Sequence, residues 1–182
     1  SEVDELVERA ERISRESKKT IKKILEDNER VSKRHKDELK KLLDELKRVV
    51  DEVRKVLERG TPKEELVKEV EEVVRRVKET LKRLLDTNHK ISKESKERLR
   101  KLVEDNKRVV ETVKKLLEDR VSDKEKVERA LRELDRLLEE SKRVVDEAEK
   151  TSDKLNKEVE EMARRVEEEV DRLLKEVRDD AK

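Results

Sequence analysis

Apolar residues recur along the chain at alternating steps of three and four, the spacing that places side chains on one face of an α-helix. A second apolar row runs beside the first and widens the stripe, which suits a helix packed against two neighbours. The other positions are mostly Glu, Lys, Arg and Asp, so each helix has one face to bury. In the first third of the chain the main row is Val3, Val7, Ala10, Ser14, Ser17, Ile21, Ile24, Asn28, Val31, His35, Leu39, Leu42, Leu46, Val49, Val53 and Val56, and the second row is Leu6, Ile13, Leu25, Leu43, Val50 and Leu57.

The pattern is first interrupted around Gly60. Gly60 can take the left-handed conformation that ends many helices, and Pro62 suits the first position of the next helix. Thr61 and Glu64 have the spacing of a capping box, in which each side chain accepts a hydrogen bond from the backbone of the other. These residues therefore predict a tight loop between two helices.

A second interruption lies around Ser122. Ser122 and Glu125 repeat the capping-box spacing, and Ser1 with Asp4 resembles it at the start of the sequence. The loops divide the chain into helices at about residues 2–59, 62–120 and 123–181. Because loops this short force neighbouring helices to run antiparallel, we predict one domain over residues 1–182. Its fold class is all-α: a long, rod-shaped, coiled-coil-like three-helix bundle with up-down-up topology.

Composition supports this fold and excludes others. The chain has 52 Lys and Arg against 51 Asp and Glu, and 31% of its residues are hydrophobic. Such values also fit disordered chains, but the regular period of the apolar residues argues for a folded protein. With no cysteine, one glycine and one proline, the chain has no disulfide framework and too few turn residues for a β-rich fold. No three consecutive residues are apolar, so we expect a soluble chain without a transmembrane span or targeting signal, and no localisation is predicted.

Polar residues interrupt the apolar stripe and gather at two levels of the predicted bundle. From the loop positions, Asn28, Ser32 and His35 lie level with residues 93, 89 and 86 of the second helix. The larger group is Asn28, Ser32, His35, Asn88, Ser92, Ser95, Thr151, Ser152 and Asn156, and the smaller group is Ser14, Ser17, Asn106 and Ser141.

Energetics indicate what these polar groups do. An unpaired polar group in a core costs about 1–3 kcal/mol, whereas a satisfied hydrogen bond returns about 1 kcal/mol. We therefore expect the clustered residues to bond across all three helices, as buried networks that fix register and helix order. In the alternative, several of them, above all the serines, lie at the edge of the stripe and bond to the carbonyl four residues earlier or to water.

The histidines are candidates for metal chemistry. His35 lies in the apolar row, and His89 lies one position outside the corresponding row with Asp86 one turn before it. Carboxylate-bridged metal bundles use paired Glu-x-x-His elements, but the residue three before His35 is Ser32. We therefore predict no metal site and treat His35 as a hydrogen-bonding residue. If His35 is buried in its neutral form, we expect the fold to lose stability below about pH 6, because the unfolded chain takes up the proton first.

Other chemistry lacks the residues it needs. No nucleophile elbow surrounds a serine, and there is no glycine-rich loop to hold phosphate. Charges of both signs are interspersed and aromatic residues are absent, which argues against nucleic-acid binding and against anchoring at a membrane surface. We predict no enzyme activity, no small-molecule substrate and no cofactor.

The chain resembles the de novo designed helical bundles with buried hydrogen-bond networks. The shared features are an aliphatic core with Asn, Ser, Thr and His in layers, Glu/Lys/Arg surfaces, capped helices of equal length and the Gly60-Thr61-Pro62 loop. The resemblance covers the whole chain and implies high thermal stability and no natural substrate. The predicted function is a monomeric structural scaffold. The alternative is a designed interaction module, either a subunit of a helical homo- or hetero-oligomer or a cage that accepts a further helix, because the second apolar row can serve another partner.

Overall fold

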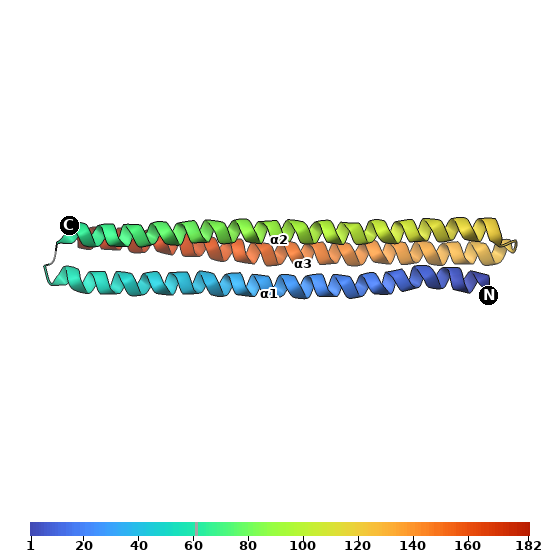
Figure 1. Cartoon of the computed structure of the whole chain (residues 1–182), viewed down its shortest axis with the longest axis horizontal. Helices are drawn as coiled ribbons and strands as arrows, with labels where there is room; N and C mark the ends of the chain where they lie inside the picture. Colours follow the sequence, from blue (N-terminus) through green and yellow to red (C-terminus); the bar gives the residue numbers. More distant parts are fainter. Residues whose placement is uncertain (61) are drawn as a thin grey trace. The chain divides into compact units, whose positions relative to one another are not determined.

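The computed structural model describes residues 1–60 and 62–182. Its regular secondary structure in this part of the chain consists of three helices, α1 (Glu2–Glu58), α2 (Lys63–Arg120) and α3 (Lys124–Asp180) (Figure 1). The predicted all-α class and the three-helix bundle are confirmed. The helix ends agree with the expected ranges to within one residue. Helix α1 ends one residue earlier than expected, α2 begins one residue later, and α3 is one residue shorter at both ends.

Local side-chain and backbone groups end the helices. The Ser1 hydroxyl accepts a hydrogen bond from the Asp4 N–H at 3.3 Å, as expected of an N-cap. Gly60 has a φ of 80°, and its N–H donates to the Leu57 carbonyl at 3.2 Å, which is the left-handed helix end that the sequence predicts. The expected cap Thr61 lies outside the described residues.

The cap of α3 differs from the expected one. Asp123 Oδ1 accepts the Lys126 N–H at 3.3 Å, and the helix begins at Lys124. The sequence indicated Ser122, one residue earlier, as the cap. Asp and Ser are equally good N-caps, so their order in the sequence does not choose between them.

The chain forms two compact units, each of which takes a segment from all three helices. Unit 1 consists of Ser1–Asn28 and Ser92–Lys154, and unit 2 consists of Glu29–Ile91 and Leu155–Lys182. Within each unit the α2 segment runs antiparallel to the α1 and α3 segments, as the short loops require (Figure 1). The single domain over residues 1–182 stays a prediction.

Aliphatic side chains fill the centre of each unit. Unit 1 contains one cluster around Leu117 and Leu134 and another around Ile24 and Leu99. Unit 2 contains one larger cluster that includes Leu46 and residues of all three helices. Burying one such side chain stabilises the fold by about 1.5–3 kcal/mol, which makes these clusters the main source of stability.

Most of the main apolar row of α1 is buried, and part of the second row joins it in the core. Leu6, Val50 and Leu57 of the second row are buried, whereas Val49 and Val56 of the main row are only half-buried. Two adjacent apolar rows reveal the width of the buried face. Its centre depends on where the two neighbouring helices lie, which the pattern in one helix does not contain.

Buried positions recur after five full helical turns in all three helices. Five turns span about 18 residues in an α-helix without supercoil, whereas the heptad of a coiled coil completes only two turns. The steps of three and four along the chain therefore follow this five-turn repeat and not a heptad. Buried sets with this spacing are Ser17, His35 and Val53 in α1, Val77, Ser95 and Val113 in α2, and Ala130, Ala148 and Val166 in α3.

Candidate functional site: buried polar layers

Asn28, Ser95 and Ser152 come from the three helices and form one polar layer in the core of unit 1. The Ser95 hydroxyl donates to Asn28 Oδ1 at 2.9 Å, and Asn28 Nδ2 donates to Ser152 Oγ at 3.1 Å. All three residues are buried, and only 2% of the surface of Ser152 is exposed. Asn28 thus uses both ends of its amide to link α1 with α2 and α3.

His35, Asn88 and Asn156 form the corresponding layer in unit 2. Asn88 Nδ2 donates to Asn156 Oδ1 at 2.5 Å, and Asn88 Oδ1 lies 2.9 Å from His35 Nδ1. Because an amide oxygen only accepts hydrogen bonds, Nδ1 of His35 carries the proton and donates. Asn156 is half-buried, and its Nδ2 donates to Glu160 Oε1 at 3.1 Å, so the bonds continue from the core to the surface.

The direction of the His35 bond bears on the expected pH dependence. Nδ1 donates to Asn88 whether the imidazole is neutral or protonated, so taking up a proton does not break this bond. The pH dependence itself stays a prediction.

The smaller polar group is joined through Asn106. Its Nδ2 donates to Ser17 Oγ at 2.7 Å and to the Leu102 carbonyl of its own helix at 2.8 Å. The bond to Ser17 links α2 with α1. Ser14 and Ser141, the other two candidates of this group, are buried in the same unit.

Three candidates of the larger group stand apart from these bonds. Ser32 is 4% exposed, and its hydroxyl oxygen has no hydrogen-bond partner within the described part of the chain. Thr151 is half-buried and donates to the Glu147 carbonyl, four residues earlier on α3, at 3.0 Å. Ser92 is also half-buried. Thr151 thus follows the alternative in which a residue at the edge of the stripe bonds to its own helix, where the nearest acceptor lies.

Replacing Ser32 with alanine is expected to raise the free energy of unfolding by about 1 kcal/mol, because it removes a buried hydroxyl that has no partner. Ser95→Ala is the matched control, since it removes an equally buried hydroxyl that bonds to Asn28, and it is expected to lower that free energy by about 1–2 kcal/mol. Both substitutions replace serine with alanine inside a helix, so the contribution of helix propensity to the free energy of unfolding is the same in the two variants. Urea unfolding followed by circular dichroism measures both, and equal effects would contradict the difference in bonding.

The bonded pairs show which residues of neighbouring helices lie at the same level. Asn28 bonds with Ser95, although the loop positions placed residue 93 at its level, and His35 bonds with Asn88 where residue 86 was expected. Both pairs differ from the expected level by about half a turn. The position of a loop gives the level of two helices only approximately, so a difference of this size is expected.

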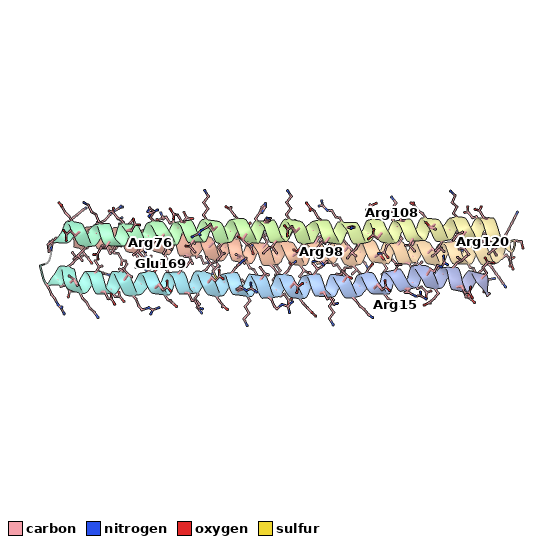
Figure 2. All side chains as sticks on the ribbon, viewed as in Figure 1. Arg15, Arg76, Arg98, Arg108, Arg120 and Glu169 are labelled. Carbon is pink, nitrogen blue, oxygen red and sulfur yellow. The ribbon has the colours of Figure 1, made fainter. Side chains whose placement is uncertain are left out.

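Rows of ion pairs run along the edges of α3 in each unit, and Figure 2 shows charged side chains along the helices, such as Arg15 of α1 and Arg108 of α2. The Lys and Arg of these rows follow the five-turn repeat, as do the Glu and Asp.

The pairs of each row join α3 to one neighbouring helix. In the first of them, hydrogen bonding to Lys18 lowers the pKa of Glu140 below its usual range. The pairs that link α1 to α3 are Lys18–Glu140 at 2.7 Å, Lys36–Glu158 at 2.7 Å and Arg54–Glu176 at 3.2 Å. The pairs that link α2 to α3 are Lys78–Asp171, Lys96–Asp153 and Lys114–Asp135.

Sequence reasoning missed these rows and the surface acceptor Glu160. The rows do leave a signal in the sequence, because their members recur with the period of the buried positions, as Asp135, Asp153 and Asp171 illustrate. Glu160 leaves none. Acidic residues are so frequent in this chain that one lying a turn after a polar residue attracts no notice.

The two histidines have different surroundings. His35 bonds to Asn88, whereas His89 and Asp86 are exposed. Within residues 1–60 and 62–182, no group of three or more His, Cys, Asp or Glu side chains is placed to hold a metal ion. The described helices include none with a stretch long and apolar enough to cross a bilayer.

Comparison with known proteins finds likeness at the level of fold. No family model and no curated protein sequence matches the chain. A solved structure described as "Computationally designed three helix bundle" aligns with 99% of this chain and 87% of its own, with 20% sequence identity and a TM-score of 0.57. The chain is therefore similar in fold to a designed three-helix bundle.

Proposed function

We propose that the chain is a designed structural scaffold without natural activity, in which buried polar residues specify the register of the helices. The observation that carries the proposal is the pair of bonds by which Asn28 joins Ser95 of α2 and Ser152 of α3 in one layer. Sliding one helix by a turn, about 5.4 Å, separates these donors from their acceptors. Aliphatic contacts tolerate such a slide far better, because they have no direction.

The free energies favour a role in specificity over a role in stability. A satisfied buried hydrogen bond contributes about 1 kcal/mol, whereas a buried group left without its partner costs about 1–3 kcal/mol. In each unit a slipped register leaves two interhelical bonds of the layer unmade. The penalty of about 2–6 kcal/mol per unit is large beside the stability of an ordinary domain, about 5–15 kcal/mol.

The ion-pair rows support a further role, the choice of helix order. Three helices can pack with α3 on either side of the α1–α2 pair. In unit 2, Lys36 of α1 and Lys78 of α2 both face carboxylates of α3. With α3 on the other side, the lysine rows of α1 and α2 would face each other, and like charges in contact repel. Exposed pairs contribute about 0–1 kcal/mol each to stability, so their main effect lies in excluding that alternative.

The five-turn repeat supports a designed origin. It governs both the buried positions and the ion pairs of all three helices. Uniform helices of matched length are a rule of de novo design, whereas natural backbones carry irregularities. The similarity in fold to a computationally designed bundle agrees with this origin.

We further propose that the scaffold is a monomer. No large hydrophobic side chain is exposed in the part of the chain that the structure describes. A surface that recruits another helix normally presents a contiguous apolar patch. The second apolar row suggested such a surface. Leu6, Val50 and Leu57 of that row are buried, and its other members Ile13, Leu25 and Leu43 are half-buried, so none of the six is fully exposed.

The variant Asn28→Leu/Ser95→Ala/Ser152→Ala tests the scaffold and the role of its polar layer together. For the wild type we expect a light-scattering mass near 21.8 kDa and one set of methyl NMR signals. The variant is expected to unfold at an equal or higher urea concentration, since every partner is removed together, but to show several sets of signals from slipped registers. A single set in the variant would overturn the role in register, and a wild-type mass at a clean multiple would favour the oligomer subunit.

A further inference from the structure

A groove lies between α1 and α2 in unit 1 and has a volume of about 370 Å³. Its apolar lining comes from Ile13 of α1 and from Val109 and Val113 of α2. Ile13 and Val109 are half-buried, so their outer surfaces remain open to a ligand, while Val113 belongs to the core beneath. The volume falls within the range of small-molecule sites, about 300–1,000 Å³.

Three arginines line the groove beside this apolar floor. Arg9 and Arg12 come from α1 and Arg108 from α2, and the lining includes Thr112 but no Asp or Glu. Arg108 contacts Asp105 of its own helix at 3.7 Å, and its side chain remains 75% exposed. A guanidinium has five N–H donors, and it also stacks on aromatic rings. The groove therefore offers concentrated positive charge beside an apolar surface.

The groove between α1 and α3 in the same unit has the opposite character. Its lining includes the carboxylates of Asp4, Glu8, Glu11 and Glu133 as well as two basic side chains. Burial, and after it the neighbouring carboxylate of Glu8, raises the pKa of Glu11 above its usual range. An anion that enters the first groove is therefore repelled from this one.

We propose that the groove between α1 and α2 of unit 1 binds one small aromatic anion, a sulfonate or carboxylate on a ring system. The anionic group meets Arg9, Arg12 and Arg108, and the rings cover Ile13 and Val109. The size of the groove selects this occupant over a protein chain. It is lined by seven residues, whereas a stable protein interface uses about 20–30 residues on each side.

Fluorescence titration with 8-anilinonaphthalene-1-sulfonate tests the site, and methyl NMR locates it. We expect one binding site with a Kd of tens of micromolar, as is usual for a ligand of this size. The signals of Ile13, Val109 and Val113 are expected to shift, while those of Val7 and Ala130, which line the α1–α3 groove, stay in place. N-phenyl-1-naphthylamine has the same rings without the sulfonate and is expected to bind at least tenfold more weakly.

Charge-reversal variants distinguish binding in this groove from a general attraction of the anion to basic side chains. Arg12→Glu/Arg108→Glu is expected to weaken binding at least tenfold, whereas Lys126→Glu/Arg129→Glu removes the same number of positive charges from the α1–α3 groove and is expected to change the affinity less than twofold. All four positions are exposed, so circular dichroism should show unchanged helix content in both variants. Equal weakening in both variants, or methyl shifts spread over both grooves, would overturn the proposal.

Discussion

Asn88→Ala is expected to lower the free energy of unfolding by about 2–4 kcal/mol, because it removes the partner of two other side chains at once. His35 Nδ1 loses its acceptor in the core, and Asn156 Oδ1 loses its donor. The loss at His35 is the larger of the two, since Asn156 is half-buried and water can reach it. Alanine is also a better helix former than asparagine, which offsets about 0.5 kcal/mol.

Urea unfolding monitored by circular dichroism measures this loss, with Thr87→Ala as the control. Thr87 precedes Asn88 on α2 but is exposed, so its replacement is expected to change the free energy of unfolding by less than about 0.5 kcal/mol. The NMR signals of the His35 ring should shift in Asn88→Ala and stay unchanged in Thr87→Ala. If the two substitutions had the same small effect, the His35–Asn88–Asn156 layer would not be holding the helices together.

Removing five full turns from each helix of unit 2 is expected to leave a shorter bundle that still folds cooperatively. The deletion takes out residues 37–54, 69–86 and 159–176, all of which belong to unit 2. Because each cut removes whole turns, the residues that follow it keep their direction toward the core. The His35–Asn88 bond and the Lys36–Glu158 pair beside the cuts are retained. Circular dichroism should show full helix content and a single unfolding transition.

A matched deletion of about four and a half turns per helix is the control. It tests whether the bundle tolerates any shortening or only the removal of whole turns. Such a cut ends about 160° out of phase, so the apolar stripe beyond it points away from the core. Residues 37–52, 71–86 and 159–174 are then absent, and Val53, Val70 and Val177 would be among the core residues turned outward. This variant is expected to lose cooperative unfolding and to aggregate. Cooperative folding of both variants would show that the five-turn repeat has no structural role.

Much of the candidate site was accessible from the sequence, because polar residues in an apolar stripe are visible wherever the helical period is regular. Asn28, His35, Asn88 and Asn106 were all identified in this way and are all buried. The roles of the smaller side chains were not. Ser95 bonds to Asn28 on another helix, while Ser32 on the same stripe as Asn28 has no partner in the described structure. Whether a buried serine finds a partner depends on the side chain that faces it from a neighbouring helix. The sequence of one helix does not contain that information.

The sequence by itself determined the number of helices, their ends to within one residue and the side chains available for polar layers. These features are local, since helical period, Gly60 and the capping residues act within a few positions along the chain. Only the tertiary structure decided how deeply each position of the two apolar rows is buried, which donor meets which acceptor, and on which side of the α1–α2 pair α3 packs in each unit. Those choices rest on contacts such as Asn28–Ser152 and Lys36–Glu158, between residues more than a hundred positions apart. Their geometry exists only once three helices share one core.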